Sequence, residues 1–305
     1  MSEGTHAPRF SAAPPGSVGA LVDELADVLS TSGRFTERDA ANEAREIVAA
    51  LYDVPRFWPS TNAHDAVEPG MGTRARKAAR KRAGGAPLAY AVGRAAFRHL
   101  TLDVDERVLI PRPETEQLVE LVLARAREPM ALAADVGTGS GAIALALASE
   151  GSFDEVLGID ISLDALTVAE ANARLLRDRG VLRARVSLAH GSLLAPLRAR
   201  RQQANVIVSN PPYIAFDEAR DLPADVRDWE PPVALFSGAQ GLDVTRRLVA
   251  DAGDALVSGG LLALEVDARR ASLVAECVGG DDRYEEVGVH LDLVGRERFV
   301  LATRR

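Results

Sequence analysis

The first part of the chain carries apolar residues at the spacing of helices. Apolar side chains recur three or four positions apart in the window 21–29, and the window 40–52 repeats this pattern. Thr36 stands where the N-cap of the second helix is expected, because its hydroxyl can accept a hydrogen bond from the first turn. Gly84-Gly85 then interrupts the helical pattern. The pattern predicts a small helical domain over residues 18–84.

A shorter periodicity follows this domain. Leu100, Leu102 and Val104 alternate with polar residues, and a second apolar run occupies residues 108–110. Alternation of this kind is typical of half-buried strands. We therefore expect residues 85–112 to form a β-hairpin that links the helical domain to a larger domain over residues 113–305.

From about residue 130 short apolar runs alternate with helical patterns. The expected strands are 131–136, 156–159, 186–189, 206–208 and 261–266, and the expected helices are 141–149, 162–177 and 244–257. This alternation predicts an α/β fold with a parallel, doubly wound, Rossmann-like sheet. Two closely spaced runs near the end, 285–291 and 298–303, predict an antiparallel hairpin at the edge of that sheet.

A glycine-rich turn follows the first of these strands. It reads Asp135-Val136-Gly137-Thr138-Gly139-Ser140-Gly141, and Asp160 ends the next strand. Glycines let a ligand approach the backbone, the helix after the turn offers free N–H groups, and an acid at the Asp160 position can accept hydrogen bonds from ribose hydroxyls. The turn also satisfies a loose dinucleotide pattern. The acid before the turn and the third glycine favour S-adenosylmethionine, whose ammonium group an acid can face.

The strand at 206–208 ends in a second motif, Asn210-Pro211-Pro212-Tyr213. Ligands of such sheets bind at the carboxyl ends of the strands. The prolines remove two N–H donors, which leaves carbonyl acceptors. The Asn210 and Pro211 carbonyls can accept both hydrogens of a planar –NH₂ group, and Tyr213 can pack on its flat face. The motif therefore predicts methylation of an amide or of an exocyclic base amine.

Composition narrows the possible substrates and surroundings. The 305-residue chain has a formal charge of −8, whereas nucleic-acid binding usually shows as a basic excess. One local basic run, 73–82, is either a solvated helix face or a docking surface. Cys277 is the only cysteine, which fits a reducing cytoplasm, and no apolar run approaches the roughly 18 residues that span a bilayer. Residues 1–17 are expected to be a disordered leader, and neither a metal site nor a membrane is expected.

These motifs together resemble the release factor glutamine methyltransferases of bacterial translation termination. The resemblance runs from about Leu21 to the C-terminus. The glycine turn is shared by many methyltransferases, and Asn-Pro-Pro-Tyr is shared with adenine methyltransferases. The discriminating segment is Leu109-Ile110-Pro111-Arg112-Pro113-Glu114-Thr115-Glu116.

The resemblance implies a class I methyltransferase fold and a specific reaction. The implied substrate is the glutamine of the Gly-Gly-Gln motif in class-one peptide chain release factors, held partly by the N-terminal helices. The methyl donor would be S-adenosylmethionine and the product S-adenosylhomocysteine, in a monomeric cytoplasmic enzyme. The residues implied to bind the donor are Asp135, Gly137, Thr138, Gly139, Ser140, Gly141, Asp160, Ser192, Leu193 and Asn210. Those implied to bind the glutamine are Asn210, Pro211, Pro212 and Tyr213, with Asn210, Pro211 and Tyr213 in catalysis.

The chain departs from the family pattern at two places. An acid usually follows the third strand near the adenine, whereas this chain has Ser192, which can hydrogen-bond but carries no charge. After the last parallel strand it has Glu265-Val266-Asp267, so the strand glutamate remains while the local turn must differ. Neither change touches Asn210.

Four other functions stay open at this point. The first is methylation of a glutamine in a ribosomal protein, and the second is methylation of adenine in nucleic acid. The third is a nicotinamide oxidoreductase, which would need a catalytic Tyr-Lys or His-acid pair that does not follow the sheet. The fourth is a non-catalytic protein that binds S-adenosylmethionine, against which the intact Asn-Pro-Pro-Tyr motif argues.

Overall fold

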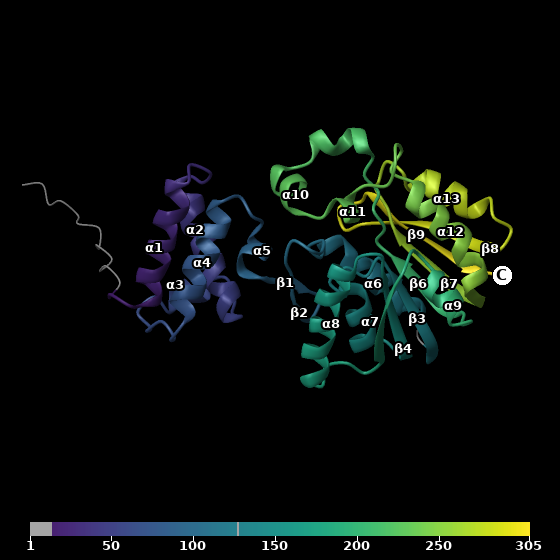
Figure 1. Ribbon diagram of the computed structural model, residues 1–305, viewed down its shortest axis with the longest axis horizontal. Helices are drawn as coiled ribbons and strands as arrows, with labels where there is room; N and C mark the ends of the chain where they lie inside the picture. The colour runs from purple at the N-terminus through teal and green to yellow at the C-terminus, as the bar shows by residue number, and fades with distance from the viewer. Residues whose placement is uncertain (1–13, 127) are drawn as a thin grey trace, which may run out of the picture. The chain divides into compact units, whose positions relative to one another are not determined.

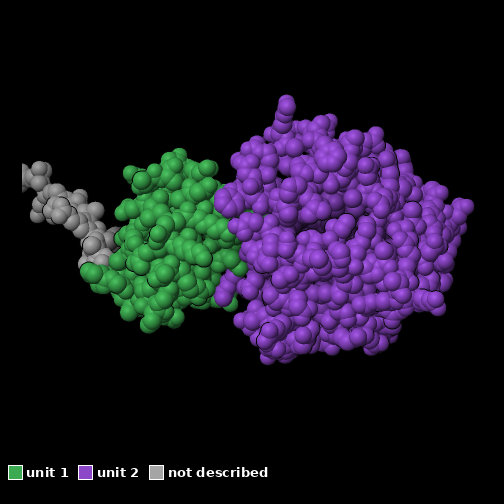
Figure 2. Space-filling view, viewed as in Figure 1, with its two compact units in different colours: residues 1–93 green, residues 94–305 purple. Residues whose placement is uncertain are grey.

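The chain divides into two compact units. The computed structural model describes residues 14–126 and 128–305. The first unit extends to Gly93 and the second comprises Arg94–Arg305 (Figure 2). The predicted leader, residues 1–17, lies outside the described residues except for its last four positions. The boundary at Gly93 falls within the 85–112 segment, which therefore contributes to both units.

The first unit is helical, as its apolar spacing predicts. Its elements are α1 (Val18–Thr31), α2 (Glu37–Tyr52), α3 (Trp58–Thr61), α4 (Met71–Ala83) and α5 (Leu88–Val92). Leu25 and Leu29 of α1 pack with Ile47 of α2 and Ala75 of α4 in one fully buried cluster. The Thr36 hydroxyl accepts a hydrogen bond from the Asp39 N–H, which confirms the predicted N-cap.

Two basic side chains of α4 form ion pairs with neighbouring helices of the first unit. Arg76 forms an ion pair with Glu24 of α1 at 2.6 Å, and Arg82 forms one with Glu43 of α2 at 2.7 Å. The remaining basic residues of α4 include Arg74, Lys77 and Arg80, which are exposed.

The second unit begins with a hairpin and continues as alternating strands and helices (Figure 1). Its elements are β1 (Arg94–Phe97), β2 (Leu100–Asp103), α6 (Pro113–Arg125), β3 (Met130–Val136), α7 (Ala142–Glu150), β4 (Phe153–Asp160), α8 (Leu163–Asp178), β5 (Arg185–His190), α9 (Ala195–Ala199), β6 (Ala204–Ser209), the 3₁₀ helix η1 (Phe216–Asp221), α10 (Ala224–Trp229), α11 (Pro232–Leu235), α12 (Asp243–Ala255), β7 (Leu256–Glu265), α13 (Ala271–Gly279), β8 (Tyr284–Leu291) and β9 (Glu297–Arg304). β1 pairs with β2, whereas residues 108–110, expected to belong to the hairpin, form no strand.

Within the described residues, the large sheet has seven strands in the order β5-β4-β3-β6-β7-β9-β8. The first five strands of that order are parallel, and β9 pairs antiparallel with both β7 and β8. The predicted fold class, a doubly wound sheet with a C-terminal antiparallel hairpin after a helical region, is confirmed. One helix was predicted too long: α12 ends at Ala255, because residues 256–257 already belong to β7.

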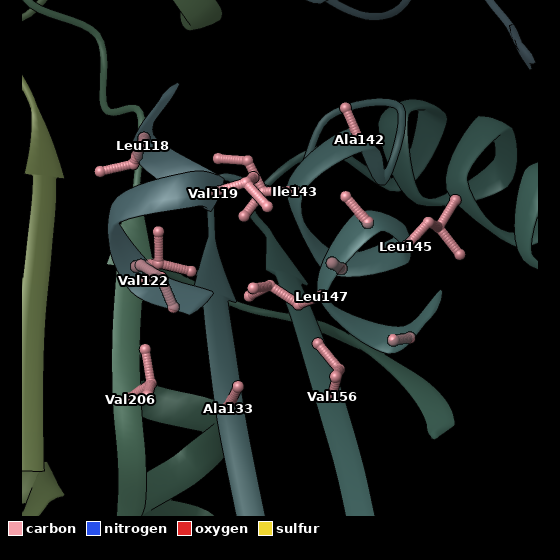
Figure 3. Packing of buried hydrophobic residues seen from close by; sticks show 14 of the residues in the cluster. Leu118, Val119, Val122, Ala133, Ala142, Ile143, Leu145, Leu147, Val156 and Val206 are labelled. Atoms are coloured by element: carbon pink, nitrogen blue, oxygen red, sulfur yellow. The ribbon is translucent and has the colours of Figure 1, made fainter. Parts of the chain in front are cut away.

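Alternate residues of each strand enter two cores. Ala133, Val156 and Val206 face the first core, where α6 and α7 supply Val122 and Leu147 (Figure 3). The intervening residues face the second core against α9, α12 and α13; they include Ala134, Leu157 and Ile207. Burial of both faces explains why the strands read as continuous apolar runs. It also leaves the carboxyl ends of the strands as the place for polar chemistry.

Candidate active site

The predicted glycine turn connects β3 to α7. Gly137, Gly139 and Gly141 have φ angles of +77°, +56° and +85°, which only glycine adopts without strain. The N–H groups of Gly137 and Thr138 donate to the Ile159 carbonyl at 2.8 and 2.9 Å, so the turn is fastened to β4. The sequence therefore places three glycines here because the backbone must curl against the neighbouring strand.

Asp135 lies beneath the turn and is fully buried. Its Oδ2 accepts hydrogen bonds from the Thr138 hydroxyl at 2.6 Å and from the Ala144 N–H at 3.1 Å. Its Oδ1 is buried without a hydrogen-bond partner among the described residues. Burial raises the pKa of Asp135 to about 7, against the effect of these hydrogen bonds. Asp135 thus supports the turn from below and carries one unsatisfied acceptor.

Asp160 ends β4 beside the same turn. Its Oδ2 accepts from the Gly139 N–H at 2.9 Å, and its Oδ1 accepts from the Ser162 N–H at 2.9 Å. Each carboxylate oxygen has a second lone pair. The side chain is therefore oriented by the backbone and keeps one acceptor site on each oxygen for a ligand.

The turn and Asp160 border a cavity of about 260 Å³, the first cavity. Its lining includes eight of the predicted site residues: Gly137, Gly139, Asp160, Ser192, Leu193, Asn210, Pro211 and Pro212. Four predicted donor-binding residues, Asp135, Thr138, Ser140 and Gly141, are not among the residues that line it. These residues support the turn instead, and the side chains of Asp135, Thr138 and Ser140 are buried there.

The Asn210-Pro211-Pro212-Tyr213 segment leaves the end of β6. The Ser209 hydroxyl donates to the Val136 carbonyl at 2.6 Å, which holds the start of the segment against β3. The Gly241 backbone lies so close that a Cβ there would stand 2.3 Å from the Tyr213 carbonyl oxygen. The segment is therefore fixed at both ends.

A second cavity, of about 330 Å³, adjoins this segment. Tyr213 and Arg112 line it together with acidic side chains of the β6–α12 connection, residues 210–242, and with Asp267. Asn210 lines both cavities, as do Leu109 and Ala234. A reacting group in one cavity can therefore meet a reacting group in the other next to Asn210.

The β6–α12 connection is tied to α6 by an ion pair between a buried carboxylate and a partly exposed arginine. Both oxygens of Glu230, a residue only 3% exposed, accept from the same Arg112 nitrogen at 2.7 and 2.6 Å. Burial raises the pKa of Glu230, while Arg112 opposes that rise. Arg112, a residue of the discriminating segment, thus anchors the connection that forms one side of both cavities.

Thr115 and Glu265 also lie at the site, and the sequence did not predict that they contact each other. The Asn210 amide nitrogen Nδ2 donates to the Thr115 hydroxyl at 3.1 Å, and Thr115 donates to Glu265 Oε2 at 2.6 Å. Thr115 is 5% exposed and Glu265 is 1% exposed. The signal for Thr115 was its place in the discriminating segment, and that for Glu265 was a charged residue at the end of an apolar strand.

Other chemistry has no comparable site in the described part of the chain. No group of three or more His, Cys, Asp or Glu side chains there could hold a metal ion. No helix within the same residues combines the length and apolarity that crossing a membrane requires.

Comparisons with known proteins find similar methyltransferases. The family model named "Methyltransferase small domain" matches residues 114–224. A release factor glutamine methyltransferase of Moorella thermoacetica is 43% identical over 226 residues, which cover 74% of this chain and 77% of the relative. One of Deinococcus radiodurans is 41% identical over 242 residues, which cover 78% and 82%.

A solved structure supports the fold alone. The hMettl16 catalytic domain in complex with the MAT2A 3′UTR hairpin 6 aligns with a TM-score of 0.53 at 13% identity, over 78% of this chain and 82% of that one. The chain thus shares its fold with this catalytic domain and its sequence with the methyltransferases named above.

Proposed function

Since the chain belongs to the release factor glutamine methyltransferase family, we propose that it methylates the side-chain amide nitrogen of a glutamine in a peptide chain release factor, with S-adenosylmethionine as donor. The observation that carries the proposal is the position of Asn210 in the wall shared by the two cavities. The glutamine would be that of the Gly-Gly-Gln motif in class-one factors. The relatives' names support the substrate, and their sequence covers most of this chain.

The first cavity fits the donor chemically. Asp160 keeps a free lone pair on each oxygen for ribose hydroxyls. The N–H groups of Gly137, Thr138, Gly139 and Gly141 already donate within the protein, so the turn has few backbone donors left for a carboxylate. Asp135 does not line this cavity, but its Oδ1 accepts no hydrogen bond, and the nearby carboxylate would favour a cationic ligand group electrostatically through the turn. Ser192 and Leu193 line the cavity where the adenine is expected, so recognition there rests on a hydroxyl and backbone groups rather than on a charge. When bound, the donor supplies a methyl group on a positively charged sulfur.

Residues of the Asn-Pro-Pro-Tyr segment would hold the glutamine amide. The Asn210 Oδ1 and the Pro211 carbonyl accept its two hydrogens, and Tyr213 packs on the flat amide. An amide nitrogen is a weak nucleophile because its lone pair is delocalised, and hydrogen bonds from its protons to acceptors shift electron density back onto nitrogen. Alignment and electrostatics then provide most of the rate enhancement. The methylated nitrogen loses its extra proton to water, so no general base is needed before attack.

The remaining features complete the proposal. The helical region, residues 18–84, would dock the release factor, since several basic side chains of α4 remain exposed. We further propose that the enzyme is a monomer in the cytoplasm, where the free thiol of Cys277 stays reduced. The charge of −8 favours a protein over a nucleic acid as substrate.

A labelling experiment tests the function. The protein is incubated with methyl-labelled S-adenosylmethionine and a purified release factor, or with total ribosomal protein, and the label is mapped by mass spectrometry. We expect it on the Gly-Gly-Gln glutamine. Asn210→Ala should abolish transfer while calorimetry still detects donor binding, and Asn42→Ala, the same change at an exposed position of α2, should be neutral. Label on a ribosomal protein or on nucleic acid, with none on the release factor, would contradict the proposal.

A further inference from the structure

A line of hydrogen bonds runs from Asn210 into the protein interior. Asn210 follows β6 and Glu265 ends β7, and the two positions are neighbours because Ser209 pairs with Leu264 in the sheet. Thr115, in the first turn of α6, lies between them, with contacts of 3.1 Å to Asn210 and 2.6 Å to Glu265. Three separate elements therefore meet at Asn210, the polar one of the three residues that line both cavities.

The chemistry of these groups fixes the direction of the line. An ionised carboxylate can only accept hydrogen bonds, and a threonine hydroxyl has a single hydrogen to donate. Once Thr115 gives that hydrogen to Glu265, its oxygen can act only as an acceptor toward Asn210. The Asn210 –NH₂ group must then face Thr115, and its Oδ1 must face the opposite way.

We propose that Thr115 and Glu265 are positioning residues that hold the Asn210 side-chain amide in one orientation, so that Oδ1 is presented to the –NH₂ group of the substrate. This inference rests on the proposed function, because only an amide or amine substrate needs an acceptor at that place. A reversed Asn210 would present its own –NH₂ group, and two donors would then oppose each other.

Protonation of Glu265 would allow the Asn210 side-chain amide to adopt the reversed orientation. A protonated carboxyl can donate to the Thr115 oxygen, which frees the hydroxyl hydrogen to bond the Asn210 Oδ1 instead. Burial raises the pKa of Glu265 to about 7, and Glu114 adds to that effect, while Thr115, Arg298 and Arg112 lower it. Tyr213 is a further titratable group near Glu265, and its pKa is raised to about 12, so it stays neutral around pH 7. The switch in orientation should therefore fall close to neutral pH.

Kinetics provide the first test. Wild-type kcat should fall as the pH drops below about 7, and Glu265→Gln should remove that fall. Thr115→Val should lower kcat by up to about 100-fold, the cost of misplacing a reacting group, while KM for the release factor changes little. Thr115→Ser keeps the hydroxyl and should retain the wild-type pH profile. Thr245→Val replaces a buried threonine in the first turn of α12 and serves as the matched control.

A spectroscopic test needs no methyl acceptor. The side-chain –NH₂ signal of Asn210, identified by its loss in Asn210→Asp, should titrate in the wild type with a midpoint near pH 7 and should not titrate in Glu265→Gln. Equal signals and equal pH profiles in both proteins would overturn the positioning role, whether or not a release factor is methylated. Failure to methylate a release factor with a titrating Asn210 signal would instead count against the proposed substrate alone.

Discussion

Replacing Asp135 by asparagine should change the pH dependence of stability in a predictable direction. Burial raises the pKa of this carboxyl to about 7 from an ordinary value of 3.8. At about 1.4 kcal/mol per pKa unit, the ionised form costs the folded state about 4 kcal/mol. Between pH 4 and 7 the folded chain binds more protons at this site than the unfolded chain. The free energy of unfolding therefore decreases as the pH rises through this window, and the full cost is present above pH 7.

The Asp135→Asn variant removes this charge but keeps the side-chain oxygen that accepts from Thr138 and Ala144. The new buried –NH₂ group costs about 1–3 kcal/mol when it finds no partner. At pH 8 the variant should thus be more stable than the wild type by about 1–3 kcal/mol, and at pH 4 it should be less stable by a similar amount. The sign of the difference should reverse between these two values.

Urea unfolding between pH 4 and 8 measures this difference. The two tryptophans lie in different units, so Trp58→Phe leaves Trp229 fluorescence as a reporter of the second unit alone. Asp178→Asn, at an exposed position at the end of α8, controls for the simple loss of a carboxylate. A stability difference between Asp135→Asn and its parent that stays constant with pH would refute the reasoning, because a constant difference means that Asp135 does not titrate in this range.

Three further outcomes follow from the site. Binding of the cationic donor should favour the ionised form of Asp135, so that a fraction of a proton is released at pH 7. Calorimetry in two buffers of different ionisation enthalpy should detect this release as a difference in binding heat. Equal heats in both buffers would argue against a charge contact. Glu230→Gln should weaken the tie to Arg112 and make the β6–α12 connection more sensitive to limited proteolysis, at a cost of up to about 3 kcal/mol, the contribution of hydrogen bonds to a charged group; unchanged cleavage would contradict an anchoring role. Gly241→Ala should cost about 1–3 kcal/mol and lower turnover, since φ is +69° and the new Cβ would collide with the Tyr213 carbonyl; full activity at wild-type stability would show that the segment can shift freely.

Strand and helix periodicity predicted most of the second unit, because strands buried on both faces and amphipathic helices leave strong patterns. The β6–α12 connection was not predicted in detail. Its short elements, η1, α10 and α11, are held by contacts such as Arg112 to Glu230, which lie 118 positions apart and leave no local periodicity.

The candidate site also has features that the sequence predicted and features that it did not. Asn210 and Asp160 could be predicted because each directly follows a strand whose carboxyl end reaches the ligand edge. The sequence could not predict which residues line the cavity and which only support the turn. Gly139 and Ser140 are neighbours in sequence, but only Gly139 borders the cavity. Likewise, the contact between Thr115 and Glu265 depends on how α6 sits on the sheet, which no short motif encodes.

Because the site consists of two cavities with a shared wall, the choice of donor and the choice of peptide depend largely on different residues. Most of the first cavity can be altered without changing a residue of the second, because only Leu109, Asn210 and Ala234 belong to both. Donor analogues with larger transferable groups could be accommodated in the first cavity. The choice of peptide could be altered through Tyr213 in the second cavity, provided that Pro211 and Pro212, which line the first, are kept. Asn210 is the polar residue at which the two redesigns must remain compatible.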